Sequence, residues 1–406
     1  MTVRRKIEFQ FNPHRQPLDT STLAFLSDDV VQSVRNFHAN LPGYARTQQH
    51  SLPALSRKLG LGAVFVKDES TRFGLNAFKG LGGSYAVAMH ISKNILGRNT
   101  VCSYEELRSE SVRSRIKDLT FVTATDGNHG RGVAWTAEQL GVKASVYMPK
   151  GSSPVRAENI RSHGAQCTIT ELNYDDTVRM AAKAAETNGW VLLQDTAWPG
   201  YETVPLWIMQ GYLTLASEAF EQMCELGVDH PTHVFLQAGV GSFAAAIMGY
   251  CLSQAGSKPP CIAIIEPDEA DCFLRSAATV DGRAEIVSGD MPTIMAGLAC
   301  GEPSSLSWPL IRDHADIFFS VEDRVAADGM RILAAPAPNG DPPIISGESG
   351  AVGAGLLYAI MQDPDLIPVK HKLSLDNESR VLLISTEGNT SPEIYQRIVW
   401  LGDNDL

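Results

Sequence analysis

The sequence is poor in positive charge and in cysteine. Its 406 residues carry a formal net charge of −12, and RRK at residues 4–6 is its one basic run. Binding to nucleic-acid phosphates needs a clustered positive surface, so this balance argues against a nucleic-acid partner. The seven cysteines include no C-x-x-C pair, so neither a zinc site nor a disulfide framework is suggested. Cys272 and Cys300 could meet in space, but their spacing does not decide this, and we expect buried free thiols.

Long apolar runs and several catalytic signatures are also missing. The longest apolar run, FAAAIMGYCL at residues 243–252, is well short of the roughly 20 residues of a membrane helix. The N-terminal charges are not followed by the apolar stretch of a secretory signal. H-E-x-x-H and G-x-x-x-x-G-K-[ST] do not occur, which removes the metalloprotease and P-loop interpretations. We therefore predict a cytoplasmic protein that acts on a small molecule, with no metal site and no membrane partner.

From about residue 120, predicted strands alternate with predicted helices. The predicted strands are LTFVTAT (119–125), KASVYMP (143–149), QCTITEL (166–172), WVLLQD (190–195), THVFLQ (232–237), CIAIIEP (261–267) and SRVLLIST (379–386). Such alternation is typical of βαβ units with a parallel sheet, and two series of it favour an α/β fold with two lobes and a cleft. Residues 1–50 are expected to be an irregular lead-in, and residues 335–351 a loop.

Three turns that follow strands could hold a ligand, because open parallel sheets bind ligands outside the carboxyl ends of their strands. They are TATDGNHGRG (123–132), QAGVGSFAA (237–245) and ISTEGNTSPE (384–393). The second runs into a helix whose first N–H groups and dipole favour a phosphate. The same turn contains GVGSFA, which fits the dinucleotide fingerprint, with Glu266 as a candidate ribose partner. A nicotinamide-dependent dehydrogenase and a glycine turn that only packs a helix therefore stay open as alternatives.

Lys79 is an unusual lysine, because it lies among small and apolar residues in GLNAFKGLGGSYA (74–86). An ammonium is costly to bury without a partner, so this residue either begins a helix with its head in solvent or is kept for chemistry. A lysine, a glycine turn for one phosphate, an asparagine in DGNHG and a hydroxyl in STEGN are the parts that hold pyridoxal phosphate. The combination predicts that cofactor.

Six segments in the same order carry a resemblance to a known family: NAFKGLGGSYA, TDGNHGRGVAW, QDTAWPGY, WIMQGY, QAGVGSF and STEGNT. They resemble the fold type II pyridoxal-phosphate enzymes, which include tryptophan synthase β, serine and threonine dehydratases and cysteine synthase. Within that family the chain is most similar to the diaminopropionate ammonia-lyases. The resemblance covers nearly the whole chain and implies a two-lobed α/β fold like that of tryptophan synthase β. It also implies a large cofactor-binding domain of residues 1–84 plus 195–406 and a smaller α/β domain of residues 85–194.

The resemblance implies roles for individual residues. Lys79 would carry the cofactor as an aldimine, and Asn128 would bond its ring hydroxyl. Thr386 would face the pyridine nitrogen, where a neutral hydroxyl favours prompt loss of a β-substituent over a long-lived quinonoid. The phosphate loop would consist of Gly239, Val240, Gly241, Ser242 and Phe243.

Asp126 departs from the Ser-Gly-Asn-His pattern that the dehydratases have at this turn. A carboxylate there would repel the substrate carboxylate unless it had another task. We hypothesise that Asp126 is a second acid/base on the face opposite Lys79, so that both D and L substrates react; the alternative is a helix cap. Asp195 in QDTAWPGY is hypothesised to bind the β-ammonium of the substrate, or else to be a turn residue. Tyr201 in the same segment is predicted to bind the substrate together with Asp126 and Asp195.

Together these features predict a lyase that converts 2,3-diaminopropionate to pyruvate and two ammonia through an aminoacrylate. The expected assembly is a homodimer. A β-replacement enzyme or a serine/threonine-type dehydratase with the same cofactor is the first alternative, and the dehydrogenase is the second. His129 is expected to be structural. Glu348 is expected to be an exposed loop residue, with contact to the cofactor or an ion as the alternative.

Overall fold

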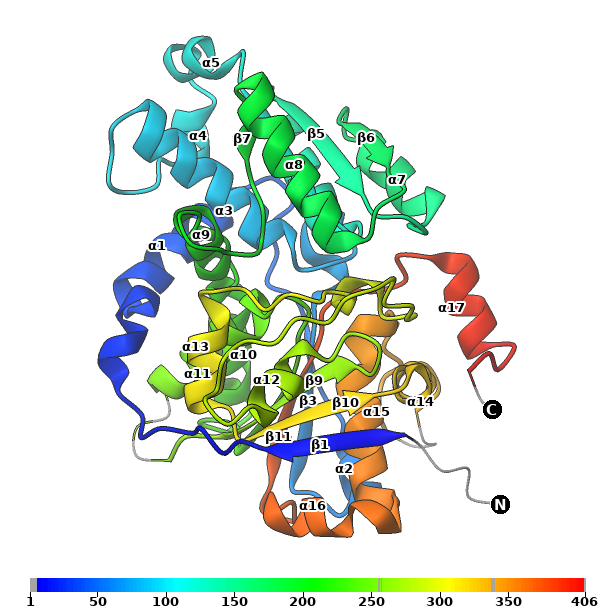
Figure 1. Ribbon diagram of the computed structural model, residues 1–406. Coiled ribbons are helices and arrows are strands. Elements are labelled where there is room, and N and C mark those ends of the chain that lie inside the picture. The colour runs from blue at the N-terminus through cyan, green and yellow to red at the C-terminus, as the bar shows by residue number, and fades with distance from the viewer. Residues whose placement is uncertain (1–5, 255, 257, 337–339, 405–406) are drawn as a thin grey trace.

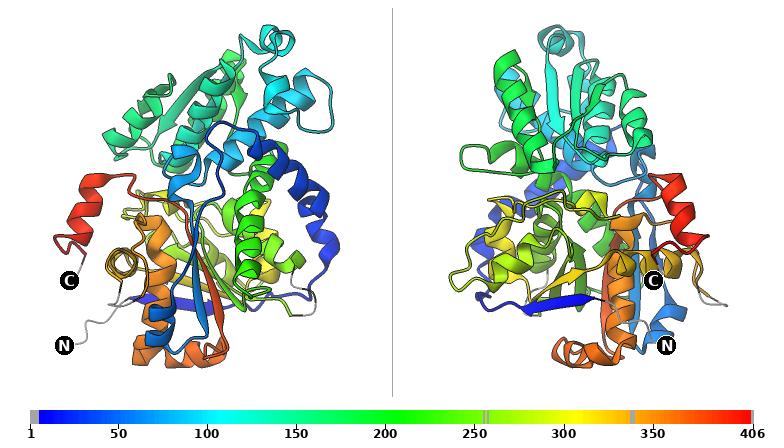
Figure 2. Two further views of the ribbon diagram at one scale, coloured as in Figure 1. Left: turned by 180° about the vertical axis from the view of Figure 1, so that it is seen from behind. Right: turned by 45° about the vertical axis from the view of Figure 1, so that its right-hand side comes forward.

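The computed structural model describes residues 6–254, 256, 258–336 and 340–404, and its strands form two separate sheets (Figures 1 and 2). The larger sheet has the strand order β1-β10-β9-β8-β11-β3-β2, and the smaller one has the order β6-β5-β4-β7. In Figure 1 the smaller sheet lies above the larger one. This arrangement confirms the α/β fold with mainly parallel sheets that the sequence predicts.

The larger sheet is parallel through its five central strands and antiparallel at its two edges, β1 and β2. Every residue of β8 and β10 is buried. This is expected for parallel strands covered by helices on both faces. Its strands are β1 (Ile7–Phe11), β2 (Gln49–Ser51), β3 (Ala63–Asp68), β8 (His233–Gln237), β9 (Cys261–Pro267), β10 (Ile317–Val321) and β11 (Arg380–Ser385).

Helices cover both faces of this sheet. The apolar helices α11 (Ser242–Gln254) and α15 (Glu348–Gln362) both contact β8, and each belongs to a different hydrophobic core. Helix α11 contains the longest apolar run of the sequence, which is therefore a buried helix. The other helices of this lobe are α1 (Asp28–Ala39), α2 (Pro53–Leu59), α9 (Thr203–Gly211), α10 (Leu213–Glu225), α12 (Cys272–Ala278), α13 (Ser307–His314), α14 (Asp323–Ala334), α16 (Ile367–Lys372) and α17 (Pro392–Val399). No helix of the described residues is long and apolar enough to cross a bilayer.

The smaller sheet contains β4 (Thr120–Ala124), β5 (Lys143–Met148), β6 (Gln166–Ile169) and β7 (Val191–Leu192), all parallel. Its helices are α6 (Asn128–Leu140), α7 (Pro154–Arg161) and α8 (Tyr174–Asn188), with the short α4 (Tyr104–Leu107) and α5 (Glu110–Ile116) before them. These strands and helices match the βαβ series predicted from residue 120. The predicted domain limit at 84/85 falls inside α3 (Gly80–His90), and the division into two domains stays a prediction.

The prediction for residues 1–50 is wrong where they form α1 and β1. Helix α1 buries Val31, Val34, Phe37 and His38 along one side, with mostly polar residues elsewhere. Strand β1 extends the sheet by pairing with β10. Only four buried side chains mark α1, which is a weak periodic signal in a polar segment.

Glycines let three helices meet at the start of α3, directly after Lys79. A Cβ on Gly82 would lie 2.7 Å from Tyr212 Cε1, and one on Gly211 would lie 2.6 Å from the Leu81 carbonyl oxygen. A Cβ on Gly132 of α6 would likewise lie 2.8 Å from the Cα of Gly80. The glycines that follow Lys79 therefore serve close backbone packing, and the packing fixes the position of the lysine.

A buried ion cluster supports the segment that leads to Lys79. The Lys67 Nζ atom lies 2.8 Å from Glu218, and Arg72 contacts Glu69 at 2.8 Å and Glu218 at 2.7 Å, all without solvent exposure. Burial alone would raise the pKa of Glu218, but the hydrogen bonds and charges of Arg72 and Lys67 lower it to about 2. This carboxyl therefore stays ionised and ties α10 to β3 and to the turn at residues 69–74.

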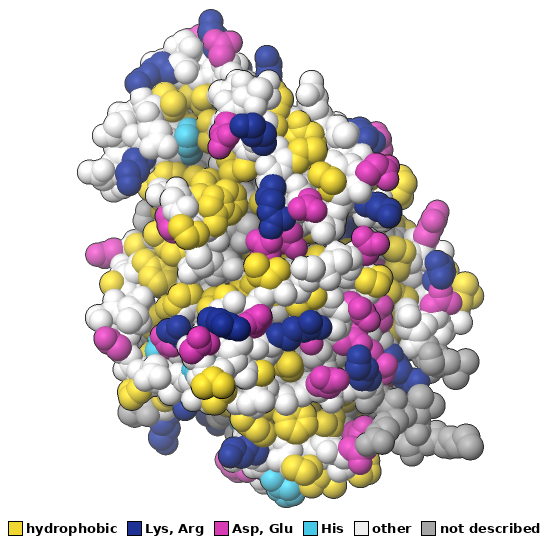
Figure 3. Space-filling view, viewed as in Figure 1, with side chains coloured by type: hydrophobic (Ala, Val, Ile, Leu, Met, Phe, Trp, Pro, Cys, Tyr) yellow, Lys and Arg dark blue, Asp and Glu magenta, His cyan; other side chains and the backbone are white. Residues whose placement is uncertain are grey.

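The free, buried thiols of Cys272 and Cys300 agree with the sequence prediction, and one face of the surface carries mixed charges (Figure 3). All seven cysteines are free, and the Cys272 Sγ atom lies 3.7 Å from the carbonyl oxygen of Cys300. On the face seen in Figure 3, lysine and arginine side chains lie among acidic ones without forming a broad basic patch.

Candidate active site

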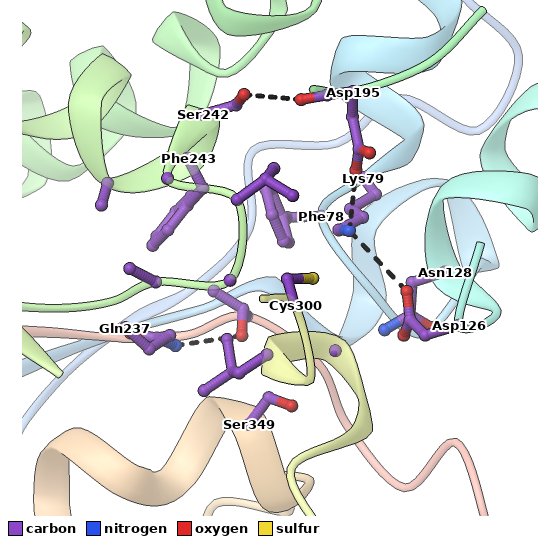
Figure 4. Close-up of a pocket in the computed structure, with 18 of the residues that line it drawn as sticks. Phe78, Lys79, Asp126, Asn128, Asp195, Gln237, Ser242, Phe243, Cys300 and Ser349 are labelled. Atoms are coloured by element: carbon purple, nitrogen blue, oxygen red, sulfur yellow. Dashed lines mark hydrogen bonds and ion pairs between the residues drawn. The ribbon is translucent and has the colours of Figure 1, made fainter. Parts of the chain in front are cut away.

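A pocket lies where β4, β8 and β11 end, with residues of both lobes around it (Figure 4). The predicted site residues that line it are Lys79, Asp126, Asn128, Asp195, Gly239, Val240, Gly241, Ser242, Phe243 and Thr386. The structure thus brings together three turns that are far apart in the sequence. Their meeting at the carboxyl ends of parallel strands is the arrangement expected for a ligand site.

Lys79 extends into this pocket between two carboxylates. Its Nζ atom lies 2.9 Å from Asp195 Oδ2 and 3.8 Å from Asp126 Oδ1 (Figure 4). Burial would lower the pKa of this amine, but the charges of Asp195 and Asp126 outweigh burial and raise it above the usual value. The amine is therefore protonated in this structure, and it must lose that proton before it can act as a nucleophile.

Asp195 is held at the end of β7 by contacts to both of its carboxylate oxygens. Oδ1 accepts hydrogen bonds from Tyr174 and from the Gln194 side chain, both at 3.1 Å, while Oδ2 accepts one from Lys79. Although burial opposes ionisation, the charge of Lys79 lowers the pKa of Asp195 well below its usual value. This carboxylate already holds one ammonium group in the pocket.

Asp126 follows β4 and does not cap the helix after it. The residue before the first turn of α6 is Gly127, and no side chain caps this helix. One carboxylate oxygen of Asp126 faces Lys79, while the other, Oδ2, is buried and has no hydrogen-bond partner among the described residues. The cap interpretation is therefore not supported, and Asp126 is placed where it can exchange a proton with a ligand.

The glycine turn after β8 has the shape of a phosphate cradle. A Cβ on Gly239 would lie 3.0 Å from the Gly297 carbonyl oxygen. Gly241 has a φ of +92°, and its Cβ would lie 2.5 Å from Phe273 Cζ. Only glycine suits these positions, and the first N–H groups of α11 have no partner within the helix. The Ser242 hydroxyl donates to the backbone oxygen of Asp195 at 2.6 Å, so this turn is joined to the carboxylate that holds Lys79.

Thr386 and Asn128 complete the groups suited to a pyridine ring. The Gln237 side chain donates to Thr386 Oγ1 at 3.0 Å, which leaves the threonine hydroxyl hydrogen free to donate to a ring nitrogen. Asn128 donates to Glu387 Oε2 at 2.6 Å. Lysine, phosphate cradle, neutral hydroxyl and amide all surround one pocket, and this set of donors fits pyridoxal phosphate.

Two of the sequence interpretations receive no geometric support. Tyr201 does not line the pocket: its hydroxyl donates to the Leu192 carbonyl and accepts from the Gln194 N–H, and its ring stacks on Trp198. Through these two hydrogen bonds Tyr201 stabilises the end of β7 and the residues after it. Glu266, the candidate ribose partner, is fully buried and accepts the N–H groups of Phe273 and Leu274, both at 2.8 Å. That carboxylate is therefore not available to a dinucleotide.

The positions of several charged residues near the pocket are not apparent from the sequence. Glu348 is not an exposed loop residue: it begins α15 and is 2% exposed, and burial and the charge of Glu387 raise its pKa to about 7. Arg156, on the first turn of α7, lies 3.6 Å from Asp126 and 3.8 Å from Glu348. His129 is structural as predicted, since its Nε2 contacts the Leu193 carbonyl oxygen at 2.7 Å.

Comparison with known proteins agrees with this geometry. Residues 41–365 match the family described as "Pyridoxal-phosphate dependent enzyme". The chain is 57% identical to a diaminopropionate ammonia-lyase of Salmonella typhimurium, over 98% of each chain. It is 46% identical to the holo diaminopropionate ammonia lyase of Escherichia coli, with a TM-score of 0.91 over 99% of this chain and 98% of the other.

A second crystal structure of the E. coli enzyme contains an aminoacrylate-PLP azomethine reaction intermediate. It is 46% identical to this chain, with a TM-score of 0.87 over 99% of this chain and 98% of the other. With these relatives and this pocket, the cofactor of the chain is pyridoxal phosphate. The chain belongs to the pyridoxal-phosphate dependent enzymes of fold type II and, within them, to the diaminopropionate ammonia-lyases.

Proposed function

We propose that this chain eliminates ammonia from 2,3-diaminopropionate, as either the D or the L isomer, and yields pyruvate and a second ammonia. The observation that carries the proposal is the position of the Lys79 ammonium between Asp195 and Asp126. A diamine presents one amine for attachment and a second as leaving group. The pocket contains a lysine for the first and a carboxylate suited to the second.

The cofactor supplies the electron sink that makes the α-proton of an attached amino acid acidic. The residues that would hold it are Lys79, Asn128, Thr386 and the turn at residues 239–243. The phosphate would lie at the start of α11, where N–H groups and the helix dipole favour an anion. The Thr386 hydroxyl would leave the ring nitrogen unprotonated, since a neutral hydroxyl is a far weaker acid than a protonated pyridine.

Lys79 and Asp126 are the two groups placed to remove the α-proton. Their charged atoms are 3.8 Å apart in the structure, and each lines the pocket. With the substrate attached between them, the two groups would address its two faces, so each isomer would meet one base. Two bases in one pocket are what a single enzyme needs to act on both isomers.

Asp195 is suited to the leaving group. Its pKa is held low chiefly by an ammonium, that of Lys79 in this structure, against the effect of burial. A substrate ammonium in the same place would likewise keep the carboxylate charged. A charged carboxylate stabilises the ammonium form of the β-amine, and an ammonium leaves as neutral ammonia without further proton donation. Serine has no positive group at this position, so Asp195 would favour the diamine over serine.

We retain a homodimeric assembly and a cytoplasmic location as parts of this proposal, on the sequence argument alone. A β-replacement enzyme or a serine/threonine-type dehydratase would use the same pocket and differ in the fate of the product. The distinguishing feature is Asp195, because neither alternative needs a carboxylate beside an ammonium leaving group.

The test begins with the absorbance spectrum of the purified protein loaded with pyridoxal phosphate. The proposal expects a visible band that Lys79→Ala loses, and pyruvate formation from both D- and L-2,3-diaminopropionate. Adding a thiol nucleophile should leave the pyruvate yield unchanged. Capture of the product by the thiol, or pyruvate from serine but from neither diamine isomer, would replace the proposal by one of the alternatives.

A further inference from the structure

Arg156 is a buried arginine that bridges the two lobes next to the pocket. It belongs to α7 of the smaller sheet and is 6% exposed. Its Nε lies 3.2 Å from Ser391 Oγ and its Nη2 lies 3.0 Å from Thr390 Oγ1, both just after β11 of the larger sheet. Two of its three nitrogens are therefore fixed by hydroxyls, and the orientation of the third follows from them.

The third nitrogen, Nη1, is aimed at Asp126. Arg156 Nη1 and Asp126 Oδ2 are both buried and form no hydrogen bond among the described residues, yet they lie only 3.6 Å apart. A buried ion without a partner is costly, so each of these atoms is the electrostatic partner of the other. The other oxygen of Asp126 faces Lys79 at 3.8 Å. The carboxylate is thus held between a fixed guanidinium and the catalytic lysine.

The packing of the arginine stem fixes this arrangement further. A Cβ on Gly127 would lie 3.0 Å from Arg156 Cδ, and Gly127 has a φ of +147°. The stem therefore lies directly on the backbone of the residue after Asp126, where a side chain would displace it. The glycine of the DGNHG motif makes room for this arginine.

The remaining charges around the pair do not replace Arg156. The acidic groups that face the guanidinium are Asp126, Glu348 on α15 and Glu387 after β11. Lys79, just before α3, faces Asp126 and also contacts Asp195. Burial lowers the pKa of Arg156, but the charges of Glu387, Asp126 and Glu348 outweigh this and raise it. Arg156 stays charged at every pH at which the enzyme works, and it is the cation that remains beside Asp126 once Lys79 is engaged.

We propose that Arg156 is a positioning residue that orients the Asp126 carboxylate for proton removal from one of the two substrate isomers. The inference rests on the proposed function and adds a residue to it. Lys79 serves the other isomer and does not contact Arg156. Loss of Arg156 should therefore affect the two isomers unequally, which a general structural role would not do.

The test compares four variants with the wild type on D- and L-2,3-diaminopropionate: Asp126→Asn, Arg156→Met, Arg156→Lys and the double variant Asp126→Asn/Arg156→Met. Asp126→Asn identifies the isomer that depends on Asp126. We expect Arg156→Met to lower kcat/KM for that same isomer by at least about tenfold and for the other isomer by less than about threefold. In the double variant the Arg156 change should add nothing, and Arg156→Lys should restore part of the loss.

Two further readouts separate positioning from folding. Exchange of the α-proton of D- and L-alanine with deuterated water should show the same isomer selectivity without any elimination. The affinity of the cofactor-free chain for pyridoxal phosphate should match that of Arg161→Met, a control on the same helix whose charge lies at the surface.

Equal losses on both isomers, no loss on either, or a full additional loss in the double variant would each overturn the role of Arg156. Failure of the proposed function has a different signature, because the wild type would then give no pyruvate from either isomer. In that case the inference about Arg156 falls with it.

Discussion

Replacing Asp195 by asparagine removes a charge while keeping the size of the side chain and much of its hydrogen bonding to Tyr174 and Gln194. In the structure this carboxylate holds the ammonium of Lys79 at 2.9 Å, which shows how closely it can hold a substrate ammonium. A hydrogen bond between charged groups contributes about 1.5–3 kcal/mol. Since about 1.4 kcal/mol corresponds to a factor of ten, we expect kcat/KM for 2,3-diaminopropionate to fall about 10- to 150-fold relative to that for serine.

The quantity to measure is the ratio of kcat/KM for 2,3-diaminopropionate to kcat/KM for serine. Asp195→Asn also removes the charge partner of Lys79, so it perturbs both reactions. Pyruvate formation from 2,3-diaminopropionate and from serine, each with wild type and variant, gives that ratio directly. Asp176→Asn on α8, whose carboxylate lies at the surface beside Arg179, is the matched control and should leave the ratio unchanged. An equal loss of kcat/KM on both substrates would refute the assignment of Asp195 to the leaving group.

The remaining predictions concern the lysine, the phosphate turn and stability in acid. Lys79→Ala should lose pyruvate formation and the visible band yet keep a cooperative thermal transition, and turnover by this variant would contradict its role. Gly241→Ala should weaken binding of pyridoxal phosphate at least about tenfold, because its Cβ would lie 2.5 Å from Phe273 Cζ at a φ of +92°; a fluorescence titration with wild-type affinity would argue against the cradle. Against the effect of burial, Arg72 and Lys67 lower the pKa of Glu218 from 4.5 to about 2, so this carboxyl stabilises the fold fully above pH 4.5. Its contribution should be lost as the pH falls from 4.5 towards 2, and a thermal midpoint that stays constant over that interval would contradict the prediction.

The α/β fold was predictable because its signals are local. Buried strands such as β4 and β5, and helices that begin beside glycine, are patterns of a few neighbouring residues. Helix α1 was not predicted because only four of its side chains are buried in the core. Strands β3 and β10 are absent from the sequence prediction, although nearly all of their residues are buried. They lie outside the regular βαβ series that guided it.

The site was predictable in its motifs but not in its charge network. Lys79 and Asp126 stand in unusual surroundings in the sequence, and both line the pocket. Arg156 reads as an ordinary helical arginine, and its partner Asp126 is thirty residues away along the chain. Glu348 follows a segment rich in proline and glycine, so its burial becomes visible only when α15 packs against β8 and β11. Charged residues that come together only in the folded chain leave no pattern among neighbouring residues of the sequence.

The hydrogen bond from the Ser242 hydroxyl to the Asp195 backbone joins two tasks that enzymes often keep apart. One partner belongs to the turn that we propose receives the phosphate, and the other to Asp195, which we propose distinguishes substrates by charge. Linkage makes such a connection reciprocal: whatever free energy the phosphate contributed to the placement of Asp195, an ammonium bound at Asp195 would contribute to retention of the phosphate. On this proposal a change of substrate charge at Asp195 would also change the affinity for the cofactor, and the two properties would have to be optimised together.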